Sequence, residues 1–237
     1  MPFPLAIVAA VAVVSAVSSG VYAAYKYYAD DDEPKKEPED EVVNLGRFAI
    51  WGHPDVGKTT FINQLLEKPI TTKKEQTSGK RIWDNIPIKT VHDKKYKINR
   101  ITDMPGNDDR FNDWLNLVIE SENIFYLVDL SKWCTSINNG EYILKVETDI
   151  ERTIEVMSEL DDKKKKLNII FTHLDRSKWQ DLLSSHVVNE LNKEINIRKL
   201  YEVMKRGKVA GYVYAANLTS SVSFKKLVDD LISDSHA

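Results

Sequence analysis

The 237-residue chain contains little cysteine and no strong excess of charge of either sign. Cys134 is its single cysteine, so an intramolecular disulfide is excluded, which fits a reducing cytosol. The formal net charge is −3, so composition does not indicate a global positive field, and no nucleic-acid partner is expected. Hydrophobic residues make up 42% of the chain and charged residues 29%, proportions that are typical of a globular protein.

Charge is missing altogether from one stretch near the N-terminus. Leu5 to Tyr25 contains no charged residue, is rich in Ala and Val, and has about the length that spans a bilayer. Tyrosines gather at its C-terminal end, where membrane helices carry aromatic residues. The sequence therefore predicts a transmembrane anchor over residues 4–28. A cleaved signal peptide is the alternative, and the absence of Lys or Arg before the apolar run argues against it.

The stretch that follows the apolar run is strongly acidic. Asp30 to Glu41 reads DDDEPKKEPEDE, with two prolines and no large apolar side chain, so it cannot bury a core. We expect a disordered acidic tether over residues 29–43 and a folded domain over residues 44–237. The basic residues nearest to the apolar run lie after it, which favours a cytosolic side for that domain.

The folded region opens with a phosphate-binding pattern. The segment GHPDVGKT, from Gly52 to Thr59, matches G-x-x-x-x-G-K-S/T, the P-loop. Glycines let the backbone approach a polyphosphate, Lys58 supplies charge for the β- and γ-phosphates, and the Thr59 hydroxyl binds Mg²⁺. An apolar strand at 47–51 and a helix at 61–66 flank it, so the phosphates would lie at a helix N-terminus. The expected nucleotide-binding residues here are Gly52, Asp55, Val56, Gly57, Lys58, Thr59 and Thr60.

Strands and helices alternate through the rest of the chain. Apolar runs predict strands, and apolar residues at helical spacing predict helices between most of them. Two strands in succession without an intervening helix indicate one antiparallel pair. The fold class expected is α/β, a doubly wound and mainly parallel sheet with one antiparallel strand. Strands are predicted at 82–91, 96–102, 124–128, 167–171 and 209–215, and helices at 111–119, 143–160, 224–231 and, as one long helix, from Trp179 to Ile195.

A second motif follows the strand at 96–102. Asp103-Met104-Pro105-Gly106 has the form D-x-x-G. Asp103 is expected to hold Mg²⁺, as a Walker-B-type acid does, and the Gly106 N–H to meet the γ-phosphate. Asn107 comes next.

Two further segments resemble the base-recognition motifs of Ras-like GTPases. Thr172-His173-Leu174-Asp175 is similar to N-K-x-D, with Thr in place of Asn and His in place of Lys. The resemblance implies that Asp175 accepts hydrogen bonds from the guanine ring, which adenine cannot donate. Ala215-Ala216-Asn217 resembles the S-A-K loop, which implies that a backbone N–H, expected at Ala216, meets the guanine carbonyl oxygen.

Taken together, the motifs resemble the Ras-like, translation-factor-class P-loop small GTPases over residues 44–237. The resemblance implies GTP or GDP and Mg²⁺ as ligands, with Thr77 as the switch-I threonine that contacts the metal; Thr71 and Thr72 are alternatives. In the family this position, after the D-x-x-G glycine, often carries a Gln that orients the attacking water, so the resemblance implies slow hydrolysis here because Asn107 is shorter. The catalytic residues expected are Lys58, Thr77, Gly106 and Asn107, and the metal ligands Thr59, Thr77 and Asp103.

The combination of anchor and GTPase domain is similar in layout to the signal recognition particle receptor β subunit and to bacterial membrane-anchored small GTPases. It implies a single-pass membrane protein with a cytosolic GTPase domain that switches an effector or meets a GTPase-activating partner. A membrane scaffold that binds nucleotide with little or no hydrolysis is one alternative, and a P-loop ATPase or kinase is another. Two segments outside the motifs stay open: the lysine run at 163–166 is a solvated loop or a lipid contact, and residues 176–207 are an extra helix or a partner surface.

Overall fold

The computed structural model describes residues 42–69, 80–89, 95–103, 111–135, 140–160 and 165–235. They belong to one compact unit, Val42–Ala237. Within these ranges no helix is both long enough and apolar enough to cross a membrane. The predicted anchor at 4–28 lies outside the described residues, as does the tether up to residue 41.

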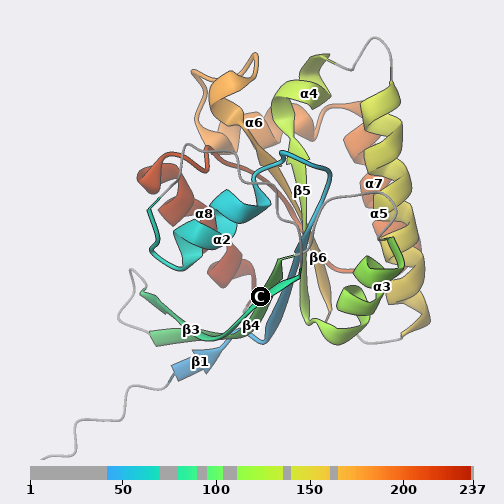
Figure 1. The fold of residues 1–237 in the computed structure, drawn as a ribbon. Helices are drawn as coiled ribbons and strands as arrows, with labels where there is room; N and C mark the ends of the chain where they lie inside the picture. The colour runs from blue at the N-terminus through green and yellow to red at the C-terminus, as the bar shows by residue number, and fades with distance from the viewer. Residues whose placement is uncertain are drawn as a thin grey trace, which may run out of the picture. The chain divides into compact units, whose positions relative to one another are not determined.

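A seven-stranded sheet runs through the described part of the unit (Figure 1). The strands follow the order β1–β4–β2–β5–β6–β7, and β3 pairs with β4. The β3–β4 pair is antiparallel and the other pairs are parallel, which confirms the predicted sheet. The strands are β1 (Val42–Asn44), β2 (Arg47–Trp51), β3 (Arg81–Lys89), β4 (Lys95–Asp103), β5 (Asn123–Asp129), β6 (Lys166–Thr172) and β7 (Val213–Ala215).

Helices cover both faces of this sheet (Figure 1). Helices α2 and α8 pack on one face, and α3, α5 and α7 pack on the other. The helices are α2 (Lys58–Leu65), α3 (Phe111–Glu120), α4 (Leu130–Thr135), α5 (Glu141–Glu159), α6 (Ser184–Leu191), α7 (Ile195–Arg206) and α8 (Ser221–Ser235), with a 3₁₀ turn, η3 (Leu174–Arg176).

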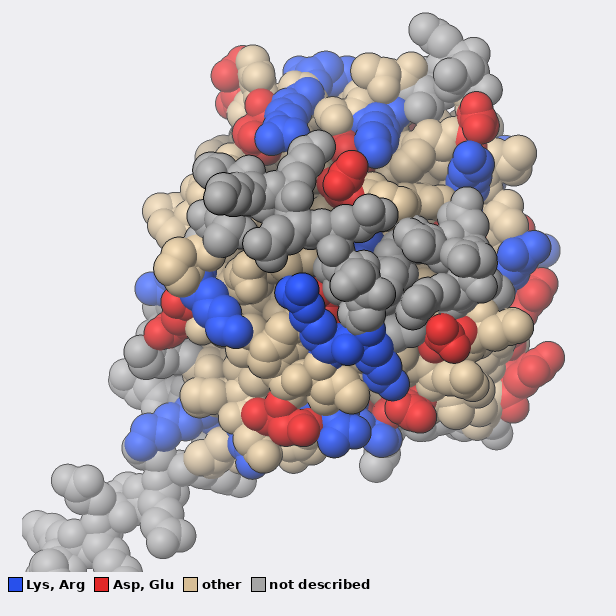
Figure 2. All heavy atoms as spheres, viewed as in Figure 1, with Lys and Arg blue, Asp and Glu red and all other residues tan. Residues whose placement is uncertain are grey.

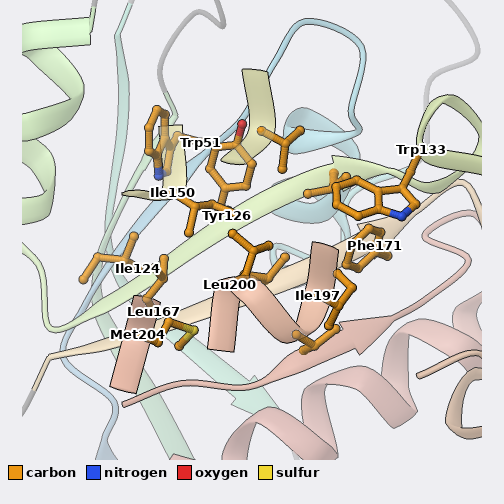
Figure 3. Packing of buried hydrophobic residues seen from close by; sticks show 14 of the residues in the cluster. Trp51, Ile124, Tyr126, Trp133, Ile150, Leu167, Phe171, Ile197, Leu200 and Met204 are labelled. Atoms are coloured by element: carbon orange, nitrogen blue, oxygen red, sulfur yellow. The ribbon is translucent and has the colours of Figure 1, made fainter. Parts of the chain in front are cut away.

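The central strands are buried on both faces, which explains their continuous apolar runs. In β5, Ile124, Tyr126 and Val128 enter one hydrophobic cluster, while Phe125 and Leu127 enter the other, because successive side chains of a strand point to opposite faces. Figure 3 shows part of the first cluster. There the ring of Trp133 lies edge-on against Phe171, with 5.2 Å between ring centroids. This packing holds the carboxyl ends of β5 and β6 side by side.

One predicted helix is wrong in its extent. The apolar residues from Trp179 to Ile195 do not form one long helix, because the chain breaks it into α6 and α7. Leu183 and Glu194 have extended backbone angles, with ψ of 146° and 138°, and each precedes the start of a helix. Leu182, Leu183 and Ile195, at or next to these breaks, are exposed. Val187 and Leu191, inside α6, are buried.

Three smaller differences concern the ends of elements. The sheet begins at Val42, two residues before the predicted domain start, because residues 42–44 form strand β1 and pair with β4. The last strand is shorter than predicted: β7 begins at Val213, and Ala210 forms only an isolated bridge with Lys166. Helix α4 was not predicted, because six residues are too few to display a helical period.

The lysine run is in part a structural element rather than a solvated loop. Lys165 is buried, and its Nζ donates to the carbonyl oxygens of Val118, Ile119 and Ser121 at 3.1, 2.7 and 2.6 Å. These carbonyls end helix α3, where a positive charge is favourable. The Lys166 Nζ donates to the Asp234 carbonyl in α8 at 2.7 Å. Residues 163 and 164 lie outside the described residues.

Candidate nucleotide-binding site

The predicted binding motifs meet at one edge of the sheet. The P-loop follows β2, Asp103 ends β4, Thr172 ends β6, and Ala215 ends β7. Because these strands are parallel, their carboxyl ends lie at the same edge, which is where ligands bind in doubly wound sheets. The fold therefore gathers segments that are more than 160 residues apart in sequence.

Two glycines give the P-loop its path. Gly52 has φ of 137°, and a Cβ on it would lie 2.3 Å from the Leu127 carbonyl oxygen in β5. Gly57 has φ of 93° and is the N-cap of α2. Both positions need glycine for backbone conformation, and Gly52 also needs it for space. Asp55, also at positive φ (64°), is exposed, Val56 is fully buried, and Thr60 is half-buried.

Lys58 is the first residue of α2, and its side chain is folded back onto the P-loop. Its Nζ donates to the carbonyl oxygens of Gly52 at 2.8 Å and His53 at 2.9 Å. Burial lowers the pKa of Lys58 from 10.5 to about 8, against the opposite effect of the Asp103 and Asp55 charges. The ammonium group is thus partly desolvated and held at the loop where phosphates are expected.

Two oxygen atoms that could coordinate a metal ion lie close together near Lys58. The Thr59 hydroxyl lies 3.5 Å from Oδ2 of Asp103, and the Asp103 side chain is fully buried. Mg²⁺ takes hard oxygen ligands and usually keeps waters and phosphate oxygens alongside one or two protein ligands. A hydroxyl and a buried carboxylate at this distance fit such an ion, so these two predicted metal ligands are brought together.

Thr172 connects the base motif to the P-loop. Its Oγ1 donates to the Val56 carbonyl at 2.8 Å and lies 3.1 Å from the Val128 carbonyl of β5. Thr172 stands where the N-K-x-D motif carries Asn. Its hydroxyl oxygen, on a shorter side chain, still reaches the P-loop. The replacement of Asn by Thr therefore leaves the end of β6 joined to the phosphate loop.

His173 lies against the same loop. Its backbone is left-handed, with φ of 53°, and a Cβ on Gly57 would lie 4.0 Å from its Cε1. Its Nδ1 is 3.0 Å from the Thr172 hydroxyl and 3.7 Å from Oδ2 of Asp129. Burial lowers the pKa of His173, while the Asp129 charge acts in the opposite direction. The imidazole therefore lies between the P-loop and Asp129.

Asp175 lies in η3 and remains accessible. About a third of its side chain (34%) is exposed, and its Oδ2 is 3.8 Å from the Nε of Arg176. An accessible carboxylate just beyond the end of β6 is consistent with the predicted contact to guanine.

In the loop after β7, one backbone N–H that was expected to bind guanine has another partner. The Ala216 N–H, expected to meet a guanine carbonyl, donates to the Phe171 carbonyl at 2.9 Å as a further rung of the sheet. Asn217 shapes the loop: its Oδ1 accepts from the N–H and hydroxyl of Thr219. Gln64 of α2 donates to the Leu218 carbonyl at 3.0 Å, which holds this loop beside the P-loop helix.

Several residues beside the site were not singled out from the sequence. His53 of the P-loop lies 3.4 Å from Oδ2 of Asp149, which also accepts from the Tyr126 hydroxyl. The Tyr142 hydroxyl accepts from the Asp129 N–H at 2.9 Å. No motif marks these residues, and the signal at Asp129, an acid directly after the apolar run at 124–128, is a common one. Thr77, Gly106 and Asn107, with the alternatives Thr71 and Thr72, lie outside the described residues.

Comparison with known proteins identifies the family. Residues 47–173 match the family described as 50S ribosome-binding GTPase. GTPase Era of Vibrio vulnificus is 29% identical over 193 residues, which cover 68% of this chain and 57% of Era. GTPase Era of Buchnera aphidicola subsp. Schizaphis graminum is 32% identical over 136 residues, covering 55% and 45%. The chain thus spans about half the length of the Era proteins it matches.

Two further similarities come from a longer relative and from a solved structure. The large ribosomal subunit assembly factor BipA of the same Buchnera is 25% identical over 215 residues, covering 79% of this chain and 34% of BipA. The Arl6 (BBS3) small GTPase of Trypanosoma brucei, solved with the nucleotide analogue GppNp, superposes with a TM-score of 0.53 at 13% identity. The superposition covers 82% of this chain and 98% of Arl6, and it shows that the two proteins share a fold. With its P-loop, buried Asp103 and base motif at one sheet edge, and with more than half of its length matched, this chain belongs to the 50S ribosome-binding GTPase family.

Proposed function

We propose that this chain binds GTP with Mg²⁺ at the sheet edge described above, hydrolyses it slowly to GDP, and acts as a nucleotide-dependent switch for a protein partner at a membrane. One observation carries the nucleotide part of the proposal. The Thr172 hydroxyl bonds to the Val56 carbonyl, so the strand end that leads into the base motif is joined directly to the phosphate loop.

The chain's own residues supply binding and orientation. Lys58 leaves the Gly52 and His53 carbonyls to meet phosphate oxygens, and the low exposure of the site strengthens the attraction between the ammonium and the phosphate charges. Thr59 and Asp103 hold Mg²⁺, which when bound neutralises charge on the phosphate oxygens. Asp175 accepts hydrogen bonds from the guanine ring and leaves a costly unpaired carboxylate when adenine is bound.

The proposed switch and the proposed membrane location are supported by the sequence motifs. Thr77 and Gly106 would contact the γ-phosphate in the GTP state only, so that hydrolysis releases their loops and a partner senses the change. Asn107 in place of Gln is the reason for slow turnover without a partner. The apolar run at 4–28 would place the domain at the cytosolic face of a membrane, as in the layout of the signal recognition particle receptor β subunit.

Nucleotide binding to the full chain tests the proposal. Fluorescent GTP, GDP and ATP analogues are titrated in the presence of Mg²⁺ against the unmodified chain, Lys58→Ala and Asp175→Ala. We expect guanine-selective binding that Lys58→Ala abolishes, whereas Asp175→Ala retains phosphate-dependent binding and loses the preference over ATP. Equal affinity for ATP and GTP in the unmodified chain would contradict the proposal and favour a P-loop ATPase or kinase.

Hydrolysis is measured separately because the main alternative is a membrane scaffold that binds nucleotide and barely hydrolyses it. Single-turnover conversion of GTP to GDP by the full chain is compared with that of Asn107→Gln. Slow turnover that the glutamine accelerates supports the switch. Absence of turnover in both proteins supports the scaffold.

A ribosomal partner is a second candidate, favoured by the family description and by the name of the BipA relative. On the face in Figure 2, Lys and Arg side chains are interspersed with Asp and Glu. Such a mixed surface does not resemble the one-sign patch that binds RNA through phosphates. Cosedimentation of the GTP-loaded chain with ribosomal subunits distinguishes this candidate from a membrane partner.

A further inference from the structure

We propose that Asp129 is a positioning residue for the base site, which fixes the ring of His173 against the P-loop. The inference rests on the proposed guanine-nucleotide function. It concerns the one position of the base motif where this chain carries an imidazole in place of a lysine.

The Thr172 hydroxyl defines which ring nitrogen carries the proton. This hydroxyl has one proton to donate, and its shortest acceptor distance is 2.8 Å, to the Val56 carbonyl. The Thr172 oxygen therefore acts as acceptor toward His173, whose Nδ1 is 3.0 Å away. It follows that Nδ1 is the protonated nitrogen and that Nε2 holds the lone pair of the neutral ring.

Asp129 stabilises this arrangement through charge. Its Oδ2 lies 3.7 Å from Nδ1, which is longer than a hydrogen bond but close enough for a strong electrostatic effect where the carboxylate is 7% exposed. A negative charge on this side of the ring favours the tautomer with a proton on Nδ1. It disfavours the other tautomer, in which the Nδ1 lone pair would face the carboxylate.

The carboxylate is itself held in place. Oδ1 of Asp129 accepts from the N–H and hydroxyl of Ser131, at 2.9 and 2.6 Å, and from the Lys132 N–H at 3.2 Å. The backbone N–H of Asp129 donates to the Tyr142 hydroxyl of α5. One carboxylate oxygen thus caps α4 while the other faces His173, so the two roles are separable by mutation.

Other charged groups of the described residues act on the pKa of His173 in opposite directions. Lys132 of α4 lies 4.0 Å from Oδ2 of Asp129, and Asp175 and Arg176 of η3 also act on the ring. Among these charges Asp129 has the largest influence on the pKa of His173, which it raises against the effect of burial. The ring is therefore coupled to Asp129 more than to the neighbours in its own motif.

A double-mutant cycle tests the proposal with fluorescent GDP and the full chain. Asp129→Asn keeps an oxygen to cap α4 and removes the charge that faces His173. We expect it to weaken GDP binding on the order of fivefold, a coupling typical of contacting residues, and by less than about twofold in a His173→Ala background. Ser131→Ala is the matched control, because it disturbs the cap and leaves the charge in place; its affinity should stay near that of the unmodified chain.

Equal losses in both backgrounds would overturn the proposal, because Asp129 would then act through α4 alone. An unchanged affinity in Asp129→Asn would overturn it as well.

A second measurement does not require nucleotide. The pKa of His173, followed by NMR through its ring proton in the free chain, should fall further in Asp129→Asn and stay unchanged in Ser131→Ala. An unchanged value in Asp129→Asn would refute the coupling. If the unmodified chain binds no guanine nucleotide, the proposed function fails together with the binding role of Asp129, while this titration still decides whether the two residues are coupled.

Discussion

Oγ1 of Thr172 donates a hydrogen bond of 2.8 Å to the carbonyl oxygen of Val56, across 116 residues of sequence. Val56 is fully buried in the P-loop, and Thr172 ends the strand that leads into the base motif. A buried carbonyl that loses its donor is left unsatisfied, so this bond contributes both to the stability of the domain and to the shape of its site.

Thr172→Val is expected to lower the free energy of unfolding by about 1–3 kcal/mol, because it leaves the Val56 carbonyl without the hydroxyl in a buried position. Urea denaturation followed by far-UV circular dichroism measures the change. Thr172→Ser keeps the hydroxyl and serves as the control, with a smaller effect. A valine variant as stable as the serine variant would show that the bond has no net effect on folding.

Nucleotide affinity should depend on pH through Lys58. Its pKa of about 8 in the free chain means that the ammonium group is lost as pH rises through 8, whereas bound phosphates favour the charged form. Binding above pH 8 therefore takes up a proton, and affinity should fall by up to about tenfold per pH unit. Titrations of fluorescent GDP between pH 7 and 9 measure this dependence. Lys58→Arg, which stays charged, should show no inflection near pH 8, and an inflection that persists there would assign the effect to another group.

The same pKa has a consequence for stability, with the opposite direction. Between about pH 8 and 10.5 the unfolded chain keeps a proton on Lys58 that the folded chain has released. The free energy of unfolding contributed by this residue therefore rises with pH across that window. Denaturation of Lys58→Met and of the unmodified chain at pH 7 and pH 9.5 should show that the change in unfolding free energy caused by the mutation is more favourable at pH 7 than at pH 9.5. A change that is equal at the two pH values would contradict the lowered pKa.

Lys165→Met should destabilise the domain by about 2 kcal/mol, because it leaves the three carbonyls at the end of α3 without their donor. Thermal unfolding measures the loss. Lys145→Met provides a matched control on α5, where the lysine makes an exposed ion pair with Glu141. Loss of stability of the same size in both variants would mean that burial of Lys165 does not matter.

Gly52→Ala is expected to abolish nucleotide binding, since its Cβ would lie 2.3 Å from a backbone oxygen of β5 and its φ of 137° is strained for alanine. Gly140→Ala separates the two effects, because Gly140 also has positive φ (67°) but a Cβ there meets nothing within 4 Å. The control should lose a little stability and keep its affinity. Similar binding by both variants would show that the P-loop can move away from β5.

Local patterns were sufficient for much of the fold. The runs at 124–128 and 167–171 are buried strands because they are apolar on both faces, and the interval between β3 and β4 is too short for a helix, which makes them antiparallel. The interval from Trp179 to Ile195 was misjudged because apolar spacing at 3.6 residues does not reveal the extended backbone at Leu183 and Glu194. Those breaks depend on how α6 and α7 pack against the sheet.

The same division holds for the candidate site. The sequence was enough to single out Gly52, Gly57, Lys58 and Thr59 as candidate site residues, because the P-loop pattern joins residues adjacent in sequence, and to single out Asp103 from its place after a strand. The position of Asp129 beside His173, and the engagement of the Ala216 N–H by Phe171, depend on how separate strands align.

The sequence by itself determined that this protein has a P-loop and a mainly parallel α/β sheet, because glycine spacing and apolar periodicity act over a few residues. The tertiary structure alone decided that Thr172 bonds to Val56, that Lys165 caps α3, and that the His173 ring lies between Gly57 and Asp129. These contacts join segments tens of residues apart, and the register of strands and the packing of helices, which no local pattern encodes, bring them together.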